Sequence, residues 1–132
     1  MTVHLVRHGQ STWNVEGRLQ GQTVHPELTE RGRREAAEAA ALLRARCPGT
    51  GEDVGLICSD LVRAAQTAAV IGQVLGVSVE QDVALREQGL GVLEGRLTKE
   101  LVPEPTPEGL DITEVRRGNG RDSRRVPGYP DR

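Results

Sequence analysis

The chain has 132 residues, a formal net charge of −2, two cysteines and no phenylalanine. This length suits one domain with one core, and the near-neutral charge argues against a broad nucleic-acid surface. No apolar run approaches the roughly 20 residues that cross a bilayer, no signal peptide precedes the first apolar run, and the cysteines lack zinc or disulfide-scaffold spacing. We therefore expect a cytoplasmic protein without cofactor, metal, nucleic-acid partner or membrane partner.

The N-terminal part of the chain is predicted to form a strand, a long loop and a helix. Val3–Val6 is a short apolar run typical of a buried strand. Residues 9–27 are polar and fit neither the helical nor the strand period. Thr29 is a suitable N-cap for a helix over residues 30–46. The apolar face of this helix is predicted to comprise Ala36, Ala40, Leu43 and Cys47.

The alternation of strands and helices continues as far as residue 79. Val54–Cys58 is a second apolar run, and Ser59 is predicted to cap a helix that ends at Leu75, before Gly76. Val77–Val79 is predicted to form a third strand near a sheet edge. The inner stripe of the second helix is predicted to comprise Ala64, Ala68, Ile71 and Leu75. This order predicts an α/β fold with a parallel sheet and right-handed crossovers.

The composition changes after Gly95. Five prolines, several glycines and paired arginines occur between Pro103 and Arg132, where few apolar residues remain. Such a segment cannot offset the entropy lost on ordering. We therefore expect an α/β domain over residues 1–95 and an irregular or disordered tail over residues 96–132, with Leu110–Val115 as a short turn of structure.

An Arg-His-Gly triplet follows the first predicted strand. Ligands of open α/β sheets bind just beyond the carboxyl ends of the strands. The guanidinium of Arg7 suits phosphate oxygens, and the imidazole of His8 can act as a nucleophile. Gly9 lets the backbone turn sharply beside them. The triplet is compatible with a catalytic site. The alternative is that Arg7 and His8 are solvated residues at a strand end, and the other motifs of the chain decide between the two.

A second arginine is expected at the same edge of the sheet. Arg63 lies in the first turn of the helix after the second strand, where unpaired N–H groups and the helix dipole favour an anion. Arg7 and Arg63 are therefore expected to converge on one phosphate. The alternative is that Arg63 is a surface arginine paired with Asp60 or Glu87.

A glycine-rich loop after the third strand places two carboxylates, Glu87 and Glu94, at this edge. A carboxyl group near a phosphate can protonate the departing alkoxide, although most glutamates are merely solvated.

The first long loop adds further polar groups. Asn14 can donate to a phosphoryl oxygen, and Gln20 adds a second amide. Arg18 can bind an anionic substrate or form an ion pair with Glu16.

Several segments together resemble the histidine phosphatase superfamily, which includes the cofactor-dependent phosphoglycerate mutases. They span residues 3–95 and read LVRHGQSTWN, RLQG, ELTERG, CSDLVRAAQTA and LREQGLGVLEG. The resemblance implies a Rossmann-like, three-layer α/β/α parallel sheet and a phosphohistidine mechanism. It implies that His8 attacks phosphorus and that Glu87 acts as general acid and then base. It also implies that Arg7, Arg63 and Asn14 hold the phosphoryl group. From their place in the first long loop, Arg18 and Gln20 are expected to bind the substrate.

The resemblance also implies a second active-site histidine, on a further strand beside the first one. The histidines of this chain are His4, His8 and His25, and none stands in the expected Ser/Thr-His-Gly context. We therefore expect a truncated fold, such as a frame-shifted product would give, whose Val3–Val6 segment is an unpaired apolar edge that favours a homodimer.

The favoured function is a phosphomonoesterase that acts on a phosphorylated small molecule and is impaired by the loss of this histidine. The entrance sequence Arg-Leu-Gln-Gly-Gln-Thr favours it over a phosphoglycerate mutase-type phosphotransferase. A second alternative is a remnant that binds phosphorylated ligands without turnover. A third is a fragment that does not fold alone.

Overall fold

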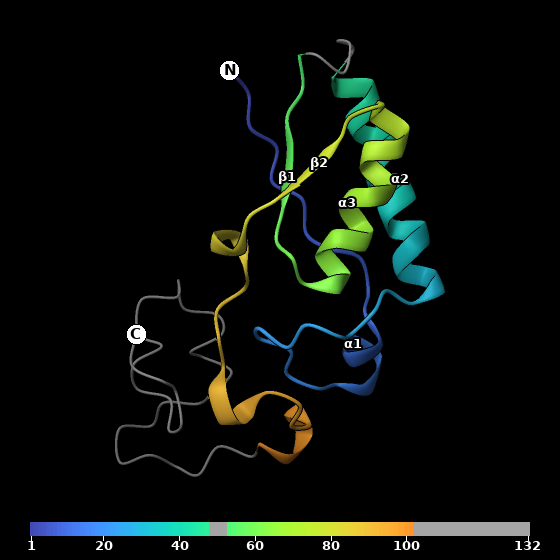
Figure 1. Cartoon of the computed structure of the whole chain (residues 1–132). Helices are drawn as coiled ribbons and strands as arrows, with labels where there is room; N and C mark the ends of the chain where they lie inside the picture. Colours follow the sequence, from blue (N-terminus) through green and yellow to red (C-terminus); the bar gives the residue numbers. More distant parts are fainter. Residues whose placement is uncertain (48–52, 102–132) are drawn as a thin grey trace.

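The computed structural model describes residues 1–47 and 53–101, in which helices pack against a small sheet (Figure 1). The helices are α1 (Thr12–Glu16), α2 (Glu30–Arg46) and α3 (Val62–Leu75), and the strands are β1 (Leu56–Cys58) and β2 (Val79–Gln81). Three short 3₁₀ turns follow, at Val83–Leu85, Gly91–Leu93 and Thr98–Glu100.

The sheet is parallel, which confirms the predicted α/β class. Leu56 pairs with Val79 and Cys58 with Gln81. Figure 1 shows α2 and α3 together on one side of the two strands. α3 packs on the strands, and α2 packs on α3. Within residues 1–47 and 53–101, the fold thus comprises the sheet and the helices of one side.

The core lies between α2, α3 and the sheet. Ala40, Ile71 and Leu75 are buried at its centre. Around them pack the partly buried side chains of Leu43, Val54, Leu56, Val70 and Val77. Small and branched aliphatic residues therefore build the core, as expected for a chain without phenylalanine.

Helix α2 begins and ends where the sequence predicts. The Thr29 hydroxyl accepts a hydrogen bond from the Gly32 N–H at 3.0 Å. Ala36 and Ala40 on the predicted inner face are fully buried. Cys47 is the C-cap, and its N–H donates to the Leu43 carbonyl.

The predicted start of α3 is wrong. Ser59 does not cap it, because residues 59–61 remain outside the helix and Leu61 is the N-cap without a side-chain hydrogen bond. The Val62 N–H donates instead to the Val24 carbonyl at 3.1 Å. A contact from the long loop therefore takes the place of a local cap. The predicted stop at Gly76 is confirmed, with a left-handed φ of 68°.

Both later strands begin two residues after their predicted starts, at Leu56 and Val79. The Val77 N–H donates to the Gly72 carbonyl at 2.9 Å and so completes the end of α3. Val77 belongs to the helix terminus for this reason, and pairing with β1 starts only at Val79.

Val3–Val6 forms no strand, which corrects the prediction for this segment. A strand requires a partner, and the described part of the chain provides none for these residues. Val3 is 69% exposed and Leu5 is 95% exposed. The apolar side chains of this segment are therefore exposed as expected, but the segment is not an edge strand of the described sheet.

The loop over residues 9–27 contains a helix that was not predicted. The Ser11 hydroxyl accepts from the Asn14 N–H at 3.1 Å, and the Asn14 Oδ1 accepts from the Ser11 N–H at 2.9 Å. These reciprocal bonds form a capping box that starts α1. Gly17 ends the helix with a left-handed φ of 70°.

The chain after Gly95 continues along the first loop. The Leu19 N–H donates to the Arg96 carbonyl at 3.0 Å, and the Thr98 N–H donates to the Gly17 carbonyl at 2.7 Å. These bonds hold the residues just beyond the predicted domain boundary against the body of the fold. Residues 102–132 of the predicted tail, which include Leu110–Val115, lie outside the described residues.

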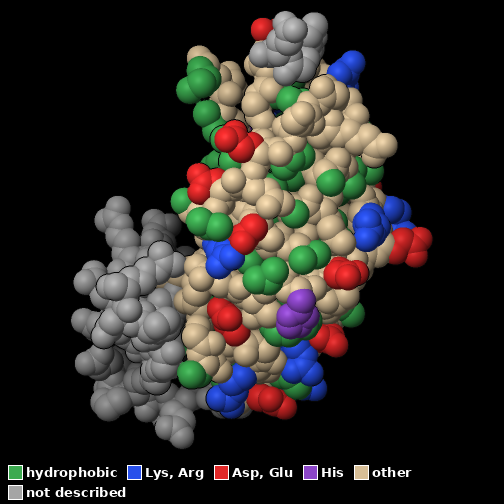
Figure 2. Space-filling view, viewed as in Figure 1, with side chains coloured by type: hydrophobic (Ala, Val, Ile, Leu, Met, Phe, Trp, Pro, Cys, Tyr) green, Lys and Arg blue, Asp and Glu red, His purple; other side chains and the backbone are tan. Residues whose placement is uncertain are grey.

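The surface carries mixed charge. In the face drawn in Figure 2, acidic and basic side chains alternate around the helices and the lower loops. In the part that the structure describes, no helix is long and apolar enough to pass through a bilayer.

Gly9 and Gly32 let the segment after His8 touch the start of α2. A Cβ on Gly32 would lie 2.0 Å from the Gln10 carbonyl oxygen, and one on Gly9 would lie 2.2 Å from the Gly32 carbonyl oxygen. Both neighbours are backbone atoms and cannot turn aside. This contact fixes the position of the Arg-His-Gly segment relative to α2.

We predict that Gly32→Ala destabilises the fold by about 1–3 kcal/mol, because the added methyl group forces the two backbones apart. Chemical denaturation measures this loss. Gly55→Ala is the matched control, since a Cβ there meets nothing within 4 Å, and its effect should stay within about 0.5 kcal/mol. Equal stability of the two variants would contradict the prediction.

Candidate active site

A cavity of about 710 Å³ lies beside β1 and the start of α3. Every predicted site residue lines it, from four separate stretches of the chain. These residues are Arg7, His8, Asn14, Arg18, Gln20, Arg63 and Glu87. The parallel order of strands and helices thus brings them to one place.

His8 presents one ring nitrogen to the cavity. Its Nδ1 lies 2.6 Å from the carbonyl oxygen of Gly9, so in the neutral ring Nδ1–H donates there and Nε2 keeps its lone pair. The pKa of His8 is lowered from 6.5, chiefly by burial. The charges of Arg63 and Arg7 lower it further, while the Gly9 carbonyl and Glu87 raise it. At neutral pH the ring is therefore uncharged and nucleophilic.

Arg63 is a buried cation rather than a surface residue. It is only 1% exposed. Its guanidinium donates to the Gly21 carbonyl at 2.6 Å and to the Thr23 carbonyl at 2.8 Å. Its buried Nε–H has no partner within the described residues. Buried donors are normally satisfied, so this group fits an anion that enters the cavity.

Glu87 stands at the rim of the cavity. Its Oε2 lies 3.2 Å from an Arg63 nitrogen, and its side chain is 55% exposed. The open surroundings allow this carboxyl group to exchange protons with water. Of the two pairings considered for Arg63 from sequence, the structure contains the one with Glu87, whereas Asp60 pairs with Arg86.

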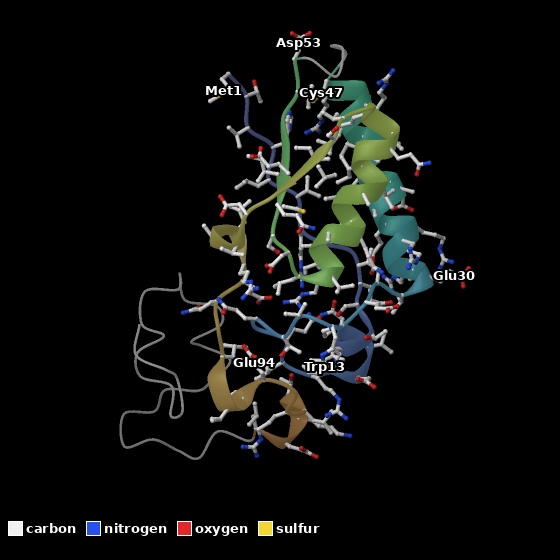
Figure 3. All side chains as sticks on the ribbon, in the orientation of Figure 1. Met1, Trp13, Glu30, Cys47, Asp53 and Glu94 are labelled. Atoms are coloured by element: carbon white, nitrogen blue, oxygen red, sulfur yellow. The ribbon has the colours of Figure 1, made fainter. Side chains whose placement is uncertain are left out.

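Glu94 holds the entrance loop together. Its carboxylate accepts from the Gln22 N–H at 2.8 Å, the Leu90 N–H at 3.1 Å and the Thr23 hydroxyl at 3.1 Å. Figure 3 places it near Trp13, below the sheet. Three donors occupy this carboxylate, so its role is structural rather than that of a solvated loop acid.

Ser11 orients the two amides of the site. The oxygen of Asn14 accepts from the Ser11 N–H, and that of Gln20 accepts from the Ser11 hydroxyl. Both amides thereby keep their NH₂ groups as available donors. Ser11 is fully buried. The sequence signal for this role is the Ser-x-x-Asn spacing of a helix start.

The two remaining predicted arginines, Arg7 and Arg18, differ in how they are held by neighbouring residues. Arg18 is tethered, because its Nε lies 3.2 Å from a Glu16 oxygen and its NH1 donates to the Gly95 carbonyl at 2.7 Å. Arg7 is exposed and lines the cavity. Arg7 is therefore the more mobile of the two cations.

The other two histidines differ in their relation to the cavity. His4 lines the same cavity, on the segment that carries His8. The His25 ring meets Trp13 edge-on, with centroids 5.1 Å apart, and His25 does not line the cavity.

Thr67 supports the backbone beside His8, a role that the sequence reasoning missed. Its hydroxyl accepts from the Gly9 N–H at 3.2 Å and donates to the Arg63 carbonyl at 2.8 Å. Its position one helical turn after Arg63 is the signal that could have found it.

The family model of the histidine phosphatase superfamily (branch 1) matches residues 3–120. The chain belongs to this superfamily, as the resemblance of its motifs predicted. A relative described as a probable phosphoglycerate mutase from Enterobacter sp. (strain 638) is 41% identical over 127 residues, which cover 96% of this chain and 54% of the relative. The chain thus spans about half the length of the curated relatives that it matches.

Solved structures agree with this assignment. A mycobacterial glucosyl-3-phosphoglycerate phosphatase in complex with VO₃ is 40% identical, with a TM-score of 0.63 over 70% of this chain and 43% of that chain. The YhfR protein of Bacillus stearothermophilus is 35% identical, with a TM-score of 0.60 over 71% of this chain and 44% of that one.

We predict that the His8 ring titrates below 6.5, because burial disfavours its charged form. NMR titration of the ring carbon measures this. Glu87→Gln should lower the pKa further, since the Glu87 charge raises it. A midpoint above 6.5, or an upward shift in the variant, would refute this account.

Thr67→Val should cost about 1–3 kcal/mol of stability, because it leaves the buried Gly9 N–H without its acceptor. Thr67→Ser is the matched variant, since it keeps the hydroxyl, and it should lose much less. Urea unfolding compares the two. A Val variant as stable as the Ser variant would mean that this hydrogen bond contributes little.

Proposed function

We propose that this protein is a phosphomonoesterase that works through a phosphohistidine on His8. One observation carries the proposal: His8, whose Nε2 is free, lines the same cavity as Arg63, whose buried Nε–H has no hydrogen-bond partner within the described residues. A nucleophile and an unsatisfied cationic donor in one cavity suit a tetrahedral oxyanion.

In the first step, the His8 Nε2 lone pair forms a bond to phosphorus while the ester P–O bond breaks. The leaving oxygen takes its electron pair and a proton from Glu87, whose carboxylate has first taken up that proton from water at the open rim. Arg63, Arg7 and the amide of Asn14 donate to the phosphoryl oxygens, and Gln20 and Arg18 face the rest of the substrate. The Gly9 carbonyl accepts from Nδ1–H and stabilises the positive charge that develops on the ring.

In the second step, water attacks the phosphohistidine. Glu87, now a carboxylate, takes a proton from this water, the N–P bond breaks, and the electron pair returns to Nε2. Inorganic phosphate leaves, and His8 is neutral again. The lowered pKa of His8 supports this cycle, because the ring stays uncharged at neutral pH.

The relatives' names favour two related chemistries. The solved neighbour is a phosphatase, whereas the curated relative is described as a probable mutase. Both names include a phosphoglycerate compound, and the cavity carries several cations that suit an anionic ester. We favour hydrolysis because the exposed Glu87 and the open cavity admit water to the phosphoenzyme. A mutase must exclude that water.

A site of this type without a second histidine donor is expected to turn over slowly. Loss of one donor to developing charge costs on the order of 10²–10³ in rate. Formation of the phosphoenzyme depends on His8, Arg63 and Glu87, all of which this chain contains.

The test is to incubate the protein with a chromogenic phosphate ester and, separately, with phosphoglycerates, and to assay acid-labile phosphate on His8 by mass spectrometry. We expect the label on His8 and its loss in His8→Ala. His25→Ala is the matched control, because His25 does not line the cavity, and it should keep the label.

Three outcomes overturn the proposal in different ways. Turnover of phosphoglycerates alone indicates the mutase. Stoichiometric phosphate binding without label indicates a binding protein. A label that survives His8→Ala shows that His8 is not the nucleophile.

A further inference from the structure

The loop between β2 and Leu90 carries Glu87 with few attachments to the body of the fold. At its start, the Asp82 N–H donates to the Cys58 carbonyl at 2.8 Å. At its end, the Leu90 N–H donates to Glu94. Between these points, the hydrogen bonds to other parts of the described chain come from two adjacent side chains, Arg86 and Glu87.

Arg86 makes the stronger of these two attachments. Its Nε donates to Asp60 Oδ1 at 2.6 Å and its NH2 donates to Asp60 Oδ2 at 2.5 Å. This is the two-pronged geometry that fixes a guanidinium on a carboxylate. The two side chains are 30% and 29% exposed. The pair joins the loop directly to the turn before α3.

Glu87 by itself is weakly held. Within the described part of the chain its one side-chain hydrogen bond, to Arg63, measures 3.2 Å, and its side chain is 55% exposed. The Arg63 end of this pair is buried, but the Glu87 end is exposed to solvent, which weakens the pair and leaves the glutamate side chain room to rotate. The position of the Glu87 backbone therefore depends on the neighbouring residue.

We propose that the Asp60–Arg86 pair is a positioning device that holds the Glu87 carboxylate against Arg63 at the rim of the cavity. Asp60 lies in the turn before α3, and Arg63 lies in the first turn of that helix. Arg86 and Glu87 are adjacent in the loop after β2, so the two ion pairs join the same two segments of the chain. Asp60 and Arg86 are positioning residues, and Glu87 carries the chemistry. The consequence for catalysis rests on the function proposed above, but the placement of Glu87 does not.

The charge states support this arrangement. The Arg86 guanidinium lowers the pKa of Asp60 below its usual 3.8, and Asp60 raises the pKa of Arg86. Both side chains are therefore charged above pH 3.8, and the ion pair weakens only as the pH falls through the lowered pKa of Asp60. It stays intact through the range near pH 6 in which a histidine titrates.

The His8 ring reports the position of Glu87 without any need for enzymatic activity. The charges that shift its pKa belong to Arg63, Glu87 and Arg7. Asp60→Asn removes none of these charges. A change in the His8 titration in this variant therefore points chiefly to a displacement of one of these groups.

The experiment is an NMR titration of His8 in the full chain. We expect Asp60→Asn and Arg86→Gln to lower its pKa in the same direction as Glu87→Gln. The double variant should match either single variant, because both act through one pair. Glu80→Gln is the matched control: it removes an exposed carboxylate of β2 and should leave the titration unchanged.

An unchanged His8 titration in folded Asp60→Asn overturns the proposal. If that variant does not fold, Arg86→Lys is the deciding test, since lysine keeps the positive charge but cannot form both hydrogen bonds to Asp60. We expect Arg86→Lys to shift the His8 pKa downward as well, and a native titration in that variant overturns the proposal.

A kinetic comparison separates this inference from the function itself. With alkyl phosphate esters, whose leaving groups need an acid, Asp60→Asn should lower kcat by about 10–10². With a nitrophenyl ester, whose leaving group needs no proton, kcat should change little. Equal losses on both esters overturn the positioning role, whereas absence of turnover in the unmodified protein overturns only the proposed function.

Discussion

A buried guanidinium is the constraint on which the rest of the structure depends. Arg63 is placed at the start of α3, where almost no water reaches it. A buried charge of this kind is tolerated only when its hydrogen bonds are made. The carbonyls of Gly21 and Thr23 supply two of them, so the first long loop must fold back across the helix. The same cation also meets Glu87 at the rim of the cavity. The burial of one side chain thus determines how the first long loop lies against the helix.

Local signals explain how much of the fold could be predicted. Helix α2 matches its prediction because Thr29 and the alanine spacing act within a few residues of one another. The start of α3 could not be found in this way, since its first N–H bonds to Val24, far away in the sequence. The same holds for Val3–Val6, whose pattern is that of a strand but whose pairing depends on a neighbour. The residue pattern predicts which secondary structure a segment favours, and contacts with distant residues determine whether that structure forms.

In the candidate site, the residues expected to contact a phosphate could be predicted from the sequence, whereas the residues that hold them in place could not. The residues that would touch a phosphate could be selected because a parallel topology brings strand ends and helix starts together. Their supports could not. Thr67 meets Gly9 across 58 positions, and Asp60 meets Arg86 across 26. Threonine, aspartate and arginine are common residues, so nothing in the sequence marks these three as supports. Such partners are visible only when the chain is folded.

The bare segment at Val3–Val6 has a consequence for the behaviour of the molecule in concentrated solution. Its amides and carbonyls have no backbone partner in the described chain, and its side chains are apolar. Main-chain groups arranged in this way recruit any extended peptide, whatever its sequence. Self-association would accordingly be driven by backbone pairing and would resist added salt, because it does not depend on the mixed charges of the surface.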